Sequence, residues 1–319
     1  MSRHTVSGKW QVGLGLSLIT CLMWGVLPIA LKIMLKHMDA VTITWFRLSV
    51  SALVLFPILY RKRGVPRYKK LRGKYIVLAG LAIVGLCGNY MIFLFGLNYL
   101  TPSGAEVVIQ FAPMFLLIGS LVIFKERFHP IQWVGFATFF VGLALFFNQS
   151  LAEILGEFSG YAKGILLIML ASFSWSVYAL SQKQLLKNLT SPSIMLLIYA
   201  GGTVLLLPIS APAQVVELDT VVIFVLLFCA VNTLIAYGSF SEALDHWEAS
   251  RVSAVITTVP IITVVCMKIG SHYFPEFIEP ESLNTLSIIG TFLVVIGSMV
   301  TSLGGRRKTV RQSLVVGDQ

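Results

Sequence analysis

The sequence predicts an all-α integral membrane protein with ten transmembrane helices, arranged as two inverted five-helix repeats. Three observations predict this fold: an apolar composition, ten long apolar segments, and a pattern of residues that occurs twice. Hydrophobic residues make up 56% of the 319 residues and charged residues only 12%, about half the charged fraction of soluble domains. So little polar side chain cannot cover a water-facing surface, which excludes a soluble fold.

The apolar segments have the length that a bilayer requires. A hydrocarbon core about 30 Å thick is crossed by about 20 helical residues. Spans are predicted at residues 11–35, 40–60, 75–97, 102–123, 131–149, 161–183, 192–211, 219–241, 250–270 and 284–304. The first span is too long for a cleavable signal peptide. The intervals between spans are too short for a soluble domain, so nearly all of the chemistry is expected in or beside the membrane.

The basic residues lie mostly on one side of the predicted membrane. The net charge is +10, and the densest run of Lys and Arg occupies the short segment 61–74. Because Lys and Arg gather in cytoplasmic loops, the tails 1–10 and 305–319 are predicted to be cytoplasmic, in the plasma membrane (inner membrane) of a bacterium. These charges flank spans instead of forming one basic face, so we do not expect nucleic-acid binding.

Cysteines and loop motifs point away from metal, cofactor and nucleotide chemistry. All four cysteines lie inside apolar segments without metal-ligand spacing: Cys21, Cys87, Cys229 and Cys266. In that setting they behave as small hydrophobes. No glycine-rich phosphate-binding loop follows a strand, so ATP is not expected to bind. We predict no metal, no cofactor and no enzymatic activity, since no nucleophile and base stand together at one depth.

The chain carries the same pattern of residues twice. Trp24 lies midway along the first span and Trp175 midway along the sixth. Pro57 and Pro208, which end the second and seventh spans, are separated by the same number of residues as the two tryptophans. Such self-similarity predicts a fold built from repeated units.

The repeat predicts two five-helix domains, at residues 11–149 and 161–304. Because each domain has an odd number of spans, the second enters the membrane from the opposite side to the first. The result is an inverted-topology repeat, which is typical of secondary transporters.

Both repeats place a proline inside their fourth helix. Pro113 and Pro260 have the same separation as Tyr90 and Tyr237. A proline removes one backbone hydrogen bond and interrupts a helix, and interrupted helices at matching positions of two halves mark transport sites. We therefore predict a hinge at each proline, near mid-membrane. The alternative is that proline is simply common in membrane spans.

Paired glycines mark the fifth helix of each repeat. Gly135 and Gly142 in the fifth span match Gly290 and Gly297 in the tenth. Small residues let membrane helices approach closely. We expect these glycines to serve helix packing, either within one chain or in a homodimer formed through the fifth and tenth helices.

Three stretches of the first half carry recognisable motifs: "WGVLPIA" in the first span, the arginine pattern "FRLSVSALVL" in the second, and "GLNYLTPSGAEVVIQFAPMFLLIGSLVIFKERFHPIQWVG" across spans 4 and 5. The second half repeats the last pattern as "EALDHWEASRVSAVITTVPIITVV". In these motifs the chain resembles the EamA-type branch of the drug/metabolite transporter superfamily. The resemblance implies ten spans and export of amino acids or related metabolites.

The two halves differ in charge. The position matching Arg47 in the second half is Ile198, and no glutamate there matches Glu126. In its place the second half has a longer acidic loop, "SHYFPEFIEPESLN". These departures weaken a strictly symmetric mechanism.

Arg47 and Glu106 are the ionisable residues that stand out inside the spans, at similar depth below the outer face. Ionisable groups in a membrane are costly and therefore candidates for function. An ion pair between them would partly offset the cost of burying each charge. Three interpretations stay open: a fixed strut between helices, a substrate-charge or proton-coupling site, or an arginine that snorkels to the interface.

Other polar and aromatic residues lie midway along the spans, where hydrocarbon offers polar groups no partner. The candidates for substrate binding are Trp24, Asn89, Tyr90, Gln110, Trp175, Asn232, Tyr237 and Thr257. The amides either form interhelical hydrogen bonds or line a cavity, and the aromatic residues either wall that cavity or pack between helices.

These observations favour a secondary transporter that moves a small-molecule substrate across the lipid bilayer by alternating access, without ATP. An exporter of amino acids or related compounds is the first interpretation. A channel or sensor, or an importer of a larger metabolite, is the alternative. The sequence leaves the substrate, the direction and any proton coupling open.

Overall fold

The computed structural model describes residues 7–66, 72–124, 129–151 and 159–303. Its regular elements there are helices: α1 (Trp10–Met34), α2 (Ala40–Arg61), α3 (Lys74–Leu97), α4 (Pro102–Val108), α5 (Phe111–Phe124), α6 (Pro130–Phe146), α8 (Gly160–Leu185), α9 (Ser191–Leu206), η2 (Leu207–Ile209), η3 (Pro212–Val215), α10 (Thr220–His246), α11 (Ala249–Ile256), α12 (Val259–Tyr273) and α13 (Thr285–Leu303). Most of the N-terminal tail, the centre of the basic segment 61–74 and the C-terminal tail lie outside these ranges.

Eight helical segments within the described residues are long and apolar enough to cross a membrane, if α11 and α12 are counted as one. A further apolar helix, α6, is shorter. Outward-facing apolar side chains fit this setting: Leu53 and Val204 are each 73% exposed, as suits contact with lipid tails. The regular structure of the described residues is thus helical and fit to span a membrane, as predicted, while the full number of ten spans stays a prediction.

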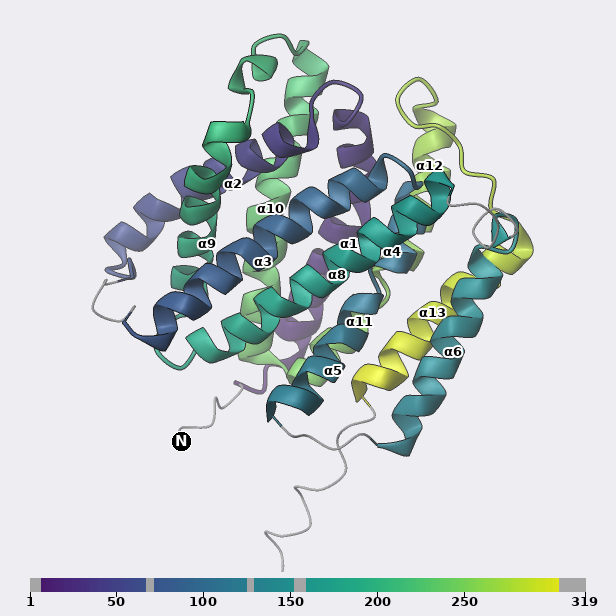
Figure 1. The fold of residues 1–319 in the computed structure, drawn as a ribbon, viewed down its shortest axis with the longest axis horizontal. Coiled ribbons are helices and arrows are strands. Elements are labelled where there is room, and N and C mark those ends of the chain that lie inside the picture. Colours follow the sequence, from purple (N-terminus) through teal and green to yellow (C-terminus); the bar gives the residue numbers. More distant parts are fainter. Residues whose placement is uncertain (1–6, 67–71, 125–128, 152–158, 304–319) are drawn as a thin grey trace, which may run out of the picture.

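Helices of the first half pair with helices of the second (Figure 1). Helix α3 packs along α8, and α1 packs along α10. The second helices of the two halves, α2 and α9, pack together, and so do the last, α6 and α13. The halves are therefore interleaved, and any space at the centre of the molecule is walled by both.

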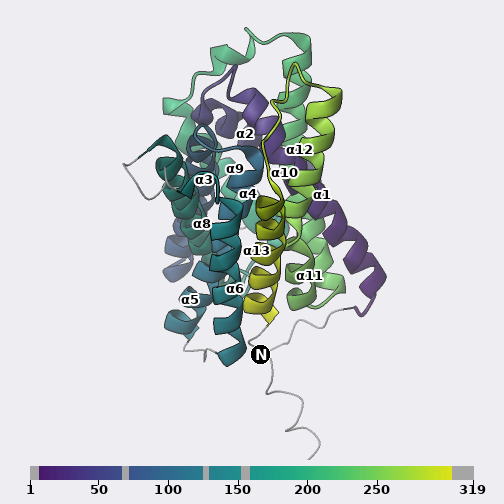
Figure 2. The ribbon, with the colours of Figure 1, turned by 90° about the vertical axis from the view of Figure 1, so that its right-hand side faces the viewer.

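The two ends of the bundle differ in what they carry. Figure 2 shows the start of α1 and the last turn of α13 at the same end, here called the terminal end. The opposite end, here called the far end, carries the connections 35–39, 98–101 and 274–284.

Polar side chains cap several helices where they begin. Asp39 accepts hydrogen bonds from the backbone N–H groups of Val41 (2.9 Å) and Thr42 (3.0 Å) at the start of α2. Thr101, Ser159 and Asp219 cap α4, α8 and α10 in the same way. Each cap satisfies an N–H group that has no partner inside the helix, so these residues fix where the helices begin.

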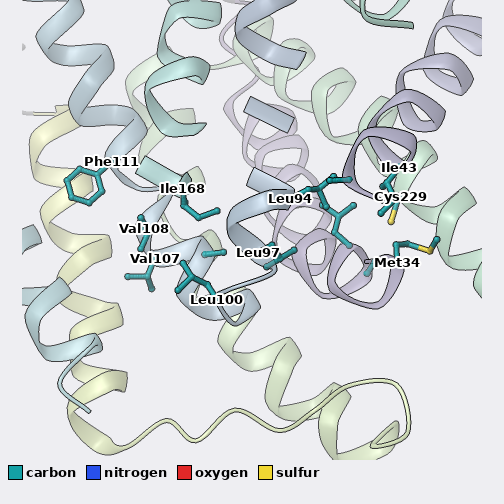
Figure 3. Packing of buried hydrophobic residues seen from close by; sticks show 14 of the residues in the cluster. Met34, Ile43, Leu94, Leu97, Leu100, Val107, Val108, Phe111, Ile168 and Cys229 are labelled. Carbon is teal, nitrogen blue, oxygen red and sulfur yellow. The ribbon is translucent and has the colours of Figure 1, made fainter. Parts of the chain in front are cut away.

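A buried apolar cluster surrounds the junction of α3 and α4 (Figure 3). Leu94, Leu97 and Leu100 pack there with Val107 of α4 and Ile168 of α8. Lipid tails are as apolar as these side chains, so close van der Waals packing holds membrane helices together more than exclusion from water does. The cluster fixes α4 against α8 and so positions the residues that follow it.

The paired glycines bring α6 and α13 into close contact within the chain. A Cβ atom on Gly135 would lie 2.9 Å from the carbonyl oxygen of Gly297, and one on Gly142 would lie 2.9 Å from that of Gly290. Only glycine permits this approach of backbone to backbone. Within this chain the glycines therefore serve the packing of α6 on α13. A homodimer formed through these two helices stays a prediction.

Candidate functional site

A cavity of about 700 Å³ lies between the two halves. All the predicted substrate-binding residues line it: Trp24, Asn89, Tyr90, Gln110, Trp175, Asn232, Tyr237 and Thr257. Arg47, Glu106 and Pro113 also face it, whereas Pro260 is buried in α12 away from its wall. The size is within the range of small-molecule sites.

Aromatic rings from several helices form one wall of the cavity. Trp24 of α1 meets Tyr237 of α10 edge to face, with ring centroids 5.4 Å apart, and Phe240 at 5.8 Å. Tyr90 of α3 lies 6.4 Å from Tyr237. These distances are typical of aromatic pairs. These rings pack on one another and also face the cavity. They therefore fit both interpretations, as a cavity wall and as packing between helices.

Sequence reasoning missed two aromatic residues of this wall, Phe93 and Phe240. Each lies three positions after a predicted residue, Tyr90 or Tyr237. Residues three apart share a helix face, so this spacing is the signal by which both could have been found.

Two buried amides hold the central helices together. Asn89 of α3 donates to the carbonyl oxygen of Ala171 in α8 (2.9 Å), and Asn232 of α10 donates to that of Met23 in α1 (2.6 Å). Both residues also line the cavity. Among the described residues, the buried side-chain oxygen of Asn232 has no hydrogen-bond partner.

The predicted ion pair between Arg47 and Glu106 does not form in this structure. The Nε of Arg47 donates to Thr233 Oγ1 in α10 (3.2 Å), and its guanidinium carbon lies 4.5 Å from the centroid of the Tyr90 ring. Glu106 is 7% exposed and stands elsewhere on the cavity wall. The two residues line one cavity, in agreement with their similar depth, but the side chains that contact the Arg47 guanidinium are those of Thr233 and Tyr90.

Both fourth helices are interrupted, as the prolines predicted. Helix α4 ends at Val108 and α5 begins at Phe111, while α11 ends at Ile256 and α12 begins at Val259. Each proline lies in the first turn after the break, where a helix tolerates proline because no hydrogen bond is lost there. Gln110 and Thr257 lie in the two breaks themselves, beside the cavity.

Hydroxyl and thiol groups of the neighbouring helix bind carbonyl groups at the breaks. Ser172 and Ser176 of α8 donate to Ile109 (3.4 Å) and Ala112 (3.0 Å) beside the first break. Cys21 of α1 contacts the carbonyl oxygen of Val255 (3.3 Å) before the second. Such contacts lower the cost of leaving helical backbone interrupted inside a membrane.

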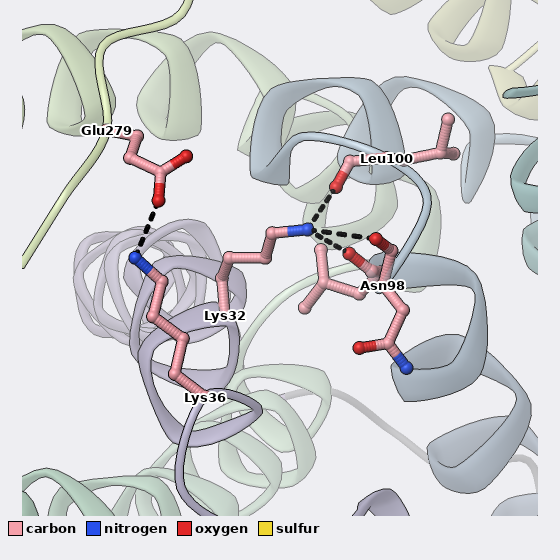
Figure 4. A network of polar contacts seen from close by, with 6 residues as sticks. Lys32, Lys36, Asn98, Leu100 and Glu279 are labelled. Carbon is pink, nitrogen blue, oxygen red and sulfur yellow. Dashed lines mark hydrogen bonds and ion pairs between the residues drawn. The ribbon is translucent and has the colours of Figure 1, made fainter. Parts of the chain in front are cut away.

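The far end is tied together by polar contacts (Figure 4). Lys32 Nζ of α1 donates to the carbonyl oxygens of Leu97 (2.5 Å) and Leu100 (3.0 Å), between α3 and α4. Lys36 forms an ion pair with Glu279 of the 274–284 connection at 2.7 Å. Through this ion pair, the acidic loop that distinguishes the second half contacts α1.

A second carboxylate of that loop reaches α4. Glu281 accepts a hydrogen bond from the backbone N–H of Ser103 (3.1 Å). Burial of this carboxyl raises its pKa above the usual value, and the hydrogen bonds from Ser103 and Thr101 offset only part of the effect. At this end the loop therefore holds α1 and α4 close.

The cavity extends the other way, toward the terminal end. Its lining includes Gln132 in the first turn of α6, Lys183 in the last turn of α8, and Ser302 in the last turn of α13. The space therefore reaches from the helix breaks to the terminal end, while the far end is held by the lysine and glutamate contacts.

Comparison with known proteins agrees with this architecture. The model of the EamA-like transporter family matches the chain twice, over residues 11–148 and 162–303. The chain belongs to the EamA-like transporter family. Among solved structures, one crystal structure superposes with a TM-score of 0.62 at 18% identity, and the match covers 93% of this chain and 99% of the other. That likeness shows the fold alone.

Relatives of this EamA-like chain include named transporters. It is 36% identical to the uncharacterized inner membrane transporter YhbE of Escherichia coli K12, over 93% of this chain and 94% of the relative. An uncharacterized transporter of Haemophilus influenzae is also 36% identical, over 92% and 95% of the two chains. A probable amino-acid metabolite efflux pump of Salmonella typhimurium is 23% identical, over 93% and 97%.

Proposed function

We propose that this EamA-like protein is a secondary transporter that moves small metabolites across a bacterial inner membrane by alternating access. The observation that carries the proposal is the central cavity, because it is walled by both halves and by both interrupted helices. A cavity at mid-bundle beside two helix breaks is the usual site of transport in repeat-built carriers. The inner-membrane location follows the name of the YhbE relative.

The pairing of helices supports ten spans in two inverted repeats. Helix α1 packs on α10 and α8 packs on α3, so the first helix of each half meets the third helix of the other. The first break bonds to α8 and the second to α1, again with the halves exchanged. Such reciprocal contacts are those expected of a two-fold axis between inverted repeats.

Alternating access gives the two ends of the cavity opposite roles. In the arrangement described, the far end is closed by the Lys32 and Lys36 contacts and the cavity extends to the terminal end. With the termini in the cytoplasm, as the basic segment predicts, this conformation faces the cytoplasm. The opposite conformation requires these contacts to separate.

The proposed substrates are amino acids or related metabolites, and the proposed direction is export. The Salmonella relative bears the name of an amino-acid metabolite efflux pump at 23% identity, and the resemblance of the motifs implies the same class. The substrate-binding roles of the eight lining residues, and of Arg47 and Glu106 as charge or coupling groups, are part of this proposal.

Counterflow in proteoliposomes tests the proposal. Purified protein is reconstituted and loaded with an excess of one unlabelled amino acid, and uptake of the same labelled compound is followed over time. A carrier shows a transient accumulation that saturates with substrate concentration, whereas a channel shows neither. A panel of amino acids and organic acids with no counterflow at all would refute transport of this class.

The hinge role of the prolines has its own test. Each break has no full set of helical hydrogen bonds, so bending is easiest there. We expect Pro113→Ala and Pro260→Ala together to leave substrate binding intact and to slow transport. Transport at the wild-type rate by a stable double variant would refute the hinges. Binding and transport that fall together would mean that the prolines only shape the site.

A further inference from the structure

Arg47 is a buried cation, and no carboxylate among the described residues forms an ion pair with it. The residue is 2% exposed. Of the five N–H donors that a guanidinium carries, only the one on Nε is hydrogen-bonded to a described residue, Thr233, whose Oγ1 accepts at 3.2 Å. The four N–H groups on the two Nη nitrogens have no hydrogen-bond acceptor among the described residues.

The surroundings hold this guanidinium in place without neutralising it. The Tyr90 ring lies 4.5 Å from the guanidinium carbon, a cation–π contact that fixes the plane of the group but carries no charge. Glu106 lines the same cavity and forms no ion pair with Arg47. A buried charge without a partner is costly, so the site favours an anion that arrives from the cavity.

The rest of the wall indicates what accompanies that anion. Trp24, Tyr237 and Phe240 pack together on one side of the cavity, and Phe93 and Trp175 also face it. Such a wall stabilises an apolar or aromatic body. The planar fork of Arg is suited to bind a carboxylate through two parallel hydrogen bonds.

We propose that Arg47 is the anion anchor of the central cavity, and that the ligand is a compound with a carboxylate on an apolar or aromatic body. Thr233 and Tyr90 are positioning residues, because they orient the guanidinium. This inference rests on the proposed transport function and names the substrate group that the site selects.

The test compares carboxylates with their neutral amides on the purified full-length protein. Two matched pairs are used: phenylpropanoate with phenylpropanamide, and phenylalanine with phenylalaninamide. Affinity is measured by isothermal titration in detergent at low salt. A charge-assisted bidentate bond predicts that wild-type protein binds each carboxylate at least about tenfold more tightly than its amide.

Substitutions then locate the source of that preference. In Arg47→Gln the ratio of carboxylate to amide affinity should fall to about one, whereas Arg47→Lys, which keeps the charge, should retain part of it. Thr233→Val keeps the guanidinium but removes the Nε bond, so the ratio should fall only partly. Lys163→Gln removes a positive charge outside the cavity and should leave the ratio unchanged.

The outcomes separate this inference from the transport proposal. Equal affinity for carboxylate and amide in wild-type protein, or no binding of any carboxylate, would overturn the anchor. Lys183 is another cation of the cavity wall. The anchor would also be overturned if the preference for carboxylate over amide disappears in Lys183→Gln but survives in Arg47→Gln. If Arg47→Gln does not fold, Thr233→Val and Arg47→Lys still decide, because an unchanged ratio in both overturns the anchor. Arg47-dependent binding without counterflow would instead refute transport and leave the anchor standing.

Discussion

The contact between α6 and α13 offers the sharpest test of the structure, through Gly297→Ala. A Cβ at this position would lie 2.5 Å from the backbone nitrogen of Phe139 and 2.7 Å from the carbonyl oxygen of Gly135. Both neighbours are backbone atoms, so no side chain can turn away to make room. Because relaxed contacts between heavy atoms lie near 3.5 Å, the two helices must separate by about 1 Å.

The expected cost follows from that separation. Forcing an extra methyl group into a packed interface costs about 1–3 kcal/mol. Alanine also favours the helix over glycine by about 1 kcal/mol, which offsets part of the loss. Gly238→Ala is the matched control, since Gly238 lies inside α10 and, apart from the adjoining backbone of its own helix, no described atom lies within 4 Å of the added Cβ. The difference between the two variants isolates the steric cost.

Thermal unfolding in detergent, followed by tryptophan fluorescence, measures this difference. We expect Gly297→Ala to unfold a few degrees below Gly238→Ala, with the same molecular mass by light scattering. Equal Tm values for the two variants would refute the close contact of α6 and α13. An unchanged Tm together with loss of a dimer would show that the glycines serve a homodimer.

Three further predictions concern the ends of the bundle. In a cysteine-free background, an impermeant thiol reagent applied to intact cells should label Ser282→Cys but not Lys62→Cys, and the reverse pattern would invert the topology. Asp39→Ala removes the cap of α2 and should cost about 0.5–2 kcal/mol in thermal or denaturant unfolding, whereas Asp39→Asn, which still caps, should unfold like wild type. The Lys36–Glu279 pair is largely exposed, so Lys36→Ala should leave Tm unchanged; a large drop would show that the pair is shielded from solvent.

The sequence by itself determined the membrane class, the helix breaks and several of the residues that line the cavity. Trp24, Asn89 and Gln110 were found without any knowledge of their neighbours. A polar group inside an apolar span is costly wherever it faces lipid, and that cost depends only on depth. Such residues must therefore turn inward in any viable packing, and the three named here line the cavity.

The tertiary structure alone decided which groups meet. Depth along a span can be counted from the sequence, but the direction in which a side chain points around its helix depends on the neighbouring helices. Arg47 shares its depth with Glu106, yet α10 and α3 present Thr233 and Tyr90 to it. The glycines were ambiguous for the same reason, because a small residue permits close approach without specifying the partner. The interleaving of the two halves selected these partners, and it did so through packing across long sequence separations that no local pattern records.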